Sequence, residues 1–65
     1  MALTQTEQTL VSGLQIFGAT KNMAAAILML LNEREDLQIE LINYMVGHQT
    51  ATPRELLEQA IEMAR

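Results

Sequence analysis

Sixty-five residues that include no cysteine and a single histidine must fold without a disulfide bridge or a cysteine-ligated metal. A hydrophobic core of this size supplies only about 3–5 kcal/mol of stability. Apolar residues nevertheless make up 49% of the chain and charged residues only 18%. The large apolar side chains are more numerous than a 7.3 kDa globule readily hides from water. The composition therefore predicts that another protein chain covers part of this surface, most simply a second copy.

Charge and hydropathy limit the other partners. The longest apolar run, residues 23–31, has about half of the roughly 20 residues that span a bilayer, so we expect no membrane-spanning helix. The first residues lack the basic and apolar regions of a secretory signal, and Glu7 interrupts them, which favours a cytoplasmic location. Eight acidic residues against four basic ones give a net charge of -4, which opposes binding to the phosphates of nucleic acids.

Caps and hydrophobic periodicity predict an all-α fold, a compact bundle of four short helices with orthogonal or helix-turn-helix-like packing. Thr4 followed by Glu7 has the spacing of a capping box, and Gly18 offers a stop for the first helix. Thr20 or Asn22 can cap the second helix. We expect the helices at about residues 4–17, 21–33, 36–46 and 53–65, within a single domain of residues 1–65.

The second and fourth helices differ in where their apolar residues fall. The second helix is apolar nearly all the way round, which is typical of a helix at the centre of a domain. Thr52, Pro53 and Glu55 supply a cap, a proline at the first helical position and a capping-box acid for the fourth helix. This helix is amphipathic, so we expect it to lie over the second with one stripe inward: Leu56, Leu57, Ala60, Ile61 and Ala64.

The third helix has two apolar faces and few polar positions, which are Gln38, Glu40 and Asn43. If one face, with Leu37, Leu41 and Met45, enters the core, the opposite face needs another cover. A two-fold dimer could hide it, or this helix could lie sandwiched between the others in a monomer. The predicted interface residues are this second face together with side chains at the margins of the other helices: Ile16, Ala25, Met29, Ile39, Ile42, Val46 and Met63.

The sequence contains few residues that could form a catalytic or metal-binding site. His48 follows the predicted end of the third helix, where a partly charged imidazole interacts favourably with the helix dipole. We therefore interpret it as a structural residue. The carboxylates of Glu55, Glu58 and Glu62 recur on the polar side of one amphipathic helix, as on an ordinary solvated face. Gly13 and Gly18 lack the lysine of a phosphate-binding loop. We therefore expect no enzymatic activity, no metal and no cofactor.

The expected function is that of a protein–protein interaction module, self-associating as a homodimer or bound to a heterologous partner, in a regulatory or accessory role. The alternative is a helix-turn-helix regulator that reads DNA with the helix at 53–65. Its contacts would come from Arg54, Gln59 and Arg65, although the acids of the same helix would face the phosphates and be repelled.

Overall fold

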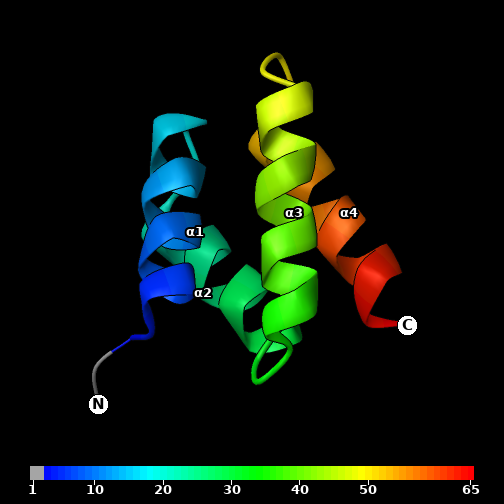
Figure 1. Cartoon of the computed structure of the whole chain (residues 1–65). Coiled ribbons are helices and arrows are strands. Elements are labelled where there is room, and N and C mark those ends of the chain that lie inside the picture. The colour runs from blue at the N-terminus through cyan, green and yellow to red at the C-terminus, as the bar shows by residue number, and fades with distance from the viewer. Residues whose placement is uncertain (1–2) are drawn as a thin grey trace.

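The computed structural model describes residues 3–65, and residues 1–2 of the predicted domain lie outside them. The described residues form four helices: α1 (Gln5–Ile16), α2 (Lys21–Leu30), α3 (Glu35–Gly47) and α4 (Pro53–Ala64). α1 and α3 lie side by side and run in the same direction, with α2 and α4 behind them in Figure 1. The predicted all-α bundle of four short helices is confirmed. The second helix is shorter than predicted, because it ends at Leu30.

Short polar motifs start three of the helices, as the sequence predicts. The hydroxyl of Thr4 accepts from the Glu7 amide at 3.1 Å, and the Glu7 carboxylate accepts from the Thr4 amide at 2.8 Å, which completes a capping box. Thr20 caps α2, and the Thr52 hydroxyl accepts from the Glu55 amide at 3.2 Å. The predicted second half of the box at α4 is wrong. The Glu55 carboxylate lies 3.4 Å from the Thr52 hydroxyl and accepts from it.

The core is a single cluster of aliphatic side chains to which every helix contributes. The radius of gyration of 10.3 Å agrees with the value of about 11 Å expected for a compact chain of this length. Because four sides of one small core are supplied by four different helices, no single helix is enclosed by the others. The largest fully buried side chains are Leu10, Leu14, Ile27, Leu31, Leu41 and Leu56.

Two expectations about which side chains turn inward are wrong. α2 is not the buried centre, because Ala24 and Ile27 face the core whereas Met29 is 78% exposed. In α4 the inward stripe is rotated, so that Met63 packs against the core and Ile61 is exposed. Apolar composition alone does not fix these orientations, since they depend on where the neighbouring helices lie.

The turn between α2 and α3 carries a feature that the sequence pattern did not indicate. Gln38 is only 2% exposed, although it is one of the few polar residues of α3. Its side-chain amide donates to the carbonyl oxygen of Leu31 at 2.9 Å. That carbonyl follows the last residue of α2, where helical partners are missing. A side chain of α3 thus stabilises the end of α2.

We expect Gln38→Glu to lower the free energy of unfolding by about 2 kcal/mol, because a buried carboxylate has no hydrogen to donate to the Leu31 carbonyl. Urea denaturation at neutral pH and one fixed protein concentration measures this effect. The matched control is Asn43→Asp, the same amide-to-acid change at an exposed position of α3, which should change stability by less than about 0.5 kcal/mol. Equal losses in both variants would mean that the added charge, and not the buried hydrogen bond, is responsible.

Glu33, in the same turn, has a φ of +60°. This left-handed conformation costs a residue with a Cβ atom about 1–2 kcal/mol, whereas glycine adopts it freely. We expect Glu33→Gly to raise the free energy of unfolding by about 0.5–1 kcal/mol, after the extra entropy of unfolded glycine is subtracted. Glu33→Ala removes the same carboxylate but keeps the Cβ atom, so it should bring no such gain in the same urea titration.

Candidate interaction groove

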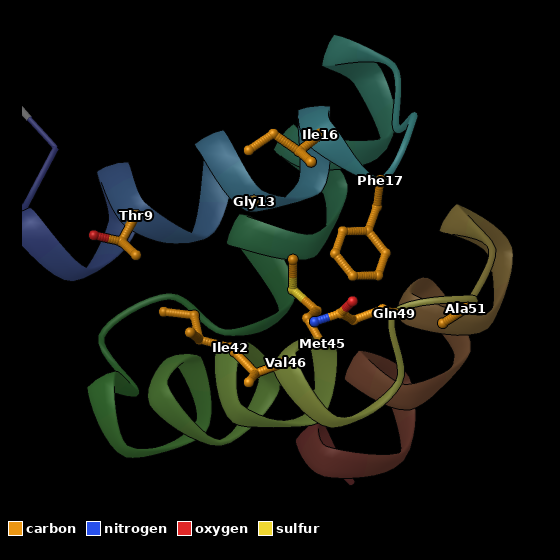
Figure 2. A pocket seen from close by; sticks show the side chains of 9 residues that line it. All are labelled: Thr9, Gly13, Ile16, Phe17, Ile42, Met45, Val46, Gln49 and Ala51. Carbon is orange, nitrogen blue, oxygen red and sulfur yellow. The ribbon is translucent and has the colours of Figure 1, made fainter.

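A groove of about 500 Å³ lies between α1 and α3 on the face that these two helices share (Figure 2). α1, α3 and the segments that follow each of them supply its walls. None of its lining residues carries a formal charge, and most are apolar, so the groove suits an apolar group of another molecule. The lining consists of Thr9, Gly13, Ile16, Phe17, Ile42, Met45, Val46, Gln49 and Ala51.

At the floor of the groove, Gly13 of α1 lies close to Met45 of α3. A Cβ atom at Gly13 would lie 2.8 Å from the terminal methyl carbon of Met45, closer than real side chains come. Glycine inside a helix costs about 1 kcal/mol relative to alanine, and here it leaves room for the Met45 side chain. Gly13 therefore serves helix packing, a role that differs from the phosphate-loop position considered from the sequence.

The rims of the groove carry two large apolar side chains that are left in water. Ile16, the last residue of α1, is 83% exposed, and Val46 on α3 is 67% exposed. Ile42 is half-buried and packs against the core while it also lines the groove. The structure thus brings together three of the predicted interface residues, one from α1 and two from α3.

The other predicted interface residues do not line this groove. Ile39 lies on α3 one turn before Ile42 and is 46% exposed. Ala25 and Met29 are exposed on α2, where Met29 borders a separate shallow hollow. Met63 packs on the core and is absent from both surfaces.

Phe17, Met45 and Gly13 complete the groove but are not among the predicted interface residues. Thr9, Gly13 and Ile16 recur at spacings of four and three, which place residues on one face of a helix. That spacing is the sequence signal that could have identified this side of α1. Figure 2 shows Phe17 extending from the end of α1 toward α3, beside Gln49. Phe17 and Gln49 follow the ends of α1 and α3, so their place in the groove depends on how these two helix ends are arranged in space.

His48 packs against its own helix. A ring nitrogen of His48, Nδ1, lies 2.9 Å from the carbonyl oxygen of Tyr44, and the two rings stack at 4.0 Å. With a proton on Nδ1, the imidazole donates to a carbonyl of the last turn of α3. Within residues 3–65 no three metal-ligating side chains are grouped so that they could hold an ion.

The residues of the DNA-reading alternative lie on the outer side of α4 among acids. Arg54 and Arg65 are exposed, and Gln59 is half-buried. The guanidinium of Arg65 pairs with the Glu62 carboxylate at 3.2 Å, in an arrangement open to solvent. Glu55 and the other carboxylates of this helix are exposed too. Any phosphate that approached α4 would therefore meet acids beside each arginine.

Comparison with known proteins gives no match: no family model fits the sequence, and no curated protein and no solved structure matches it. Among the helices described over residues 3–65, none has the length and apolar character needed to cross a membrane.

We expect this chain not to bind duplex DNA, because α4 presents carboxylates beside Arg54 and Arg65. Fluorescence anisotropy of a labelled duplex of mixed sequence, at about 50 mM salt, checks this. Binding that weakens steeply as salt is raised, and that is lost in Arg54→Glu, would contradict the expectation and support the helix-turn-helix alternative.

Proposed function

We propose that this chain is a non-catalytic protein–protein interaction module that associates with a second copy of itself through the groove between α1 and α3. The observation that carries the proposal is the exposure of Ile16 and Val46 on the rims of an uncharged, apolar groove. An accessory or regulatory role in the cytoplasm, as expected from the sequence, is part of the same proposal.

Stability supports association. Burying one large aliphatic side chain is worth about 1.5–3 kcal/mol relative to leaving it in water. A core of this size is itself worth only about 3–5 kcal/mol. Covering Ile16 and Val46 would thus add a contribution comparable to the whole net stability of the monomer. The chain has no disulfide bridge that could supply this stability instead, since it contains no cysteine.

Charge favours a second copy over a basic partner. Each chain carries a net charge of -4, so two copies repel each other unless they meet at an uncharged surface. The lining of the groove provides such a surface, because it includes no acid and no base. A basic partner would gain from contact with carboxylates, and the groove offers none.

The area that a stable dimer buries indicates how much of the α1–α3 face must belong to the interface. A stable interface buries about 800 Å² on each partner, roughly a fifth of the 4423 Å² that this chain exposes. The groove alone is smaller than this, so the shared outer face of α1 and α3 must be covered as well. Ile39, exposed on that side of α3, would then also be buried at the edge of the interface.

We expect a mass near twice 7.3 kDa in light scattering behind a sizing column, and we expect Ile16→Lys to lower it to that of one chain. A lysine ammonium in an apolar interface must be desolvated without a partner charge. The matched control is Met29→Lys, at a similarly exposed position near the end of α2, which should leave the dimer intact. Circular dichroism checks that both variants remain folded.

Two results would contradict the proposal. A wild-type chain that is monomeric over a hundredfold range of concentration does not associate with itself, and its partner must then be another protein. A dimer that is lost in Met29→Lys but persists in Ile16→Lys would place the interface on α2.

A further inference from the structure

We propose that the occupant of the groove is Ile16 of the second copy, so that each chain inserts this side chain into the groove of the other. The inference rests on the proposed function and deepens it, because it names the contacting segment and the symmetry of the pair. Two observations support it: Ile16 is highly exposed, and it lies on the same face as the groove.

Ile16 is presented for insertion. It is the most exposed large apolar side chain among residues 3–65, and it occupies the last position of α1. The chain then turns at Gly18, whose φ is +96°, so Ile16 lies directly before the turn that ends this helix. A β-branched side chain in a helix keeps nearly one rotamer, so little conformational entropy is lost when it is buried.

The groove is suited to receive this side chain. Its floor at Gly13 projects no side chain, and the flexible thioether of Met45 beside it can adapt to an irregular surface. Phe17 and Ile42 line the groove, and both also pack on the hydrophobic core, so they are held in place. A volume of about 500 Å³ admits an isoleucine with the ends of its neighbouring side chains.

The symmetry follows from the fact that Ile16 and the groove share one face. When a projection and its receiving hollow lie on one face, a two-fold axis satisfies both contacts at once, and the assembly closes as a dimer. If they lay on different faces, each copy would leave one contact open and a filament would grow. The shallow hollow beside Met29 shares no lining residue with the groove and is not needed for closure.

Engineered disulfides test this contact, since the chain contains no cysteine of its own. Ile16→Cys is mixed with Val46→Cys and oxidised, and intact mass spectrometry separates the three linked species because the two variants differ in mass. A disulfide requires Cα atoms within about 7 Å, so the mixed Ile16–Val46 link should form in good yield, together with links between two Ile16→Cys chains, since Ile16 also lines the groove. Met29→Cys mixed with Val46→Cys is the control, and its mixed yield should be at least about tenfold lower.

The outcomes separate this inference from the proposed function. If the wild-type mass is that of a monomer, both fail. If the wild-type mass is that of a dimer but Ile16→Cys links to Val46→Cys no better than Met29→Cys does, only the assignment of Ile16 is overturned. A wild-type mass that rises beyond two copies with concentration would overturn the closed two-fold arrangement.

Discussion

The packing of α1 against α3 is the contact on which both the core and the groove depend, because both helices contribute to the core and line the groove. A Cβ atom at Gly13 would lie 2.8 Å from the terminal methyl carbon of Met45, so the end of that flexible side chain would have to shift. At the other end of the pair, the hydroxyl of Thr6 donates to the Glu35 carboxylate at 2.9 Å. The two helices contribute Leu10, Leu14 and Leu41 to one core and leave their shared outer face uncovered.

That uncovered face is a consequence of size. In a bundle of four short helices each helix has one side on the core, and no further element in the described residues lies over α1 and α3. Ile16 and Val46 therefore remain in water beside a hollow, whereas Met29 is exposed next to a hollow that includes the acid Glu7. The groove is the better candidate of the two surfaces because its lining is uncharged and more of its wall is anchored to the core.

The turn between α2 and α3 shows how tertiary contacts outweigh local preferences. Glu33 adopts a left-handed conformation that is unfavourable for its residue type, and Gln38 is buried on an otherwise apolar side of its helix. Both residues are close in sequence to Leu31, whose carbonyl oxygen accepts hydrogen bonds from the Gln38 side chain and from the Arg34 amide. Satisfying that carbonyl at the end of α2 offsets the local costs, since an unpaired buried carbonyl costs about 1–3 kcal/mol.

The helix content, the starts of α1, α2 and α4 and the excess of apolar residues over what one small core holds can all be read from the amino-acid sequence. Caps depend on residues within four positions of each other, so they can be recognised locally. The packing of the helices is needed to know that α2 exposes Met29, that α4 turns Met63 inward, and that Ile16 and Val46 share a groove. These outcomes depend on where distant helices lie, because an apolar side chain packs equally well in its own core or against another chain.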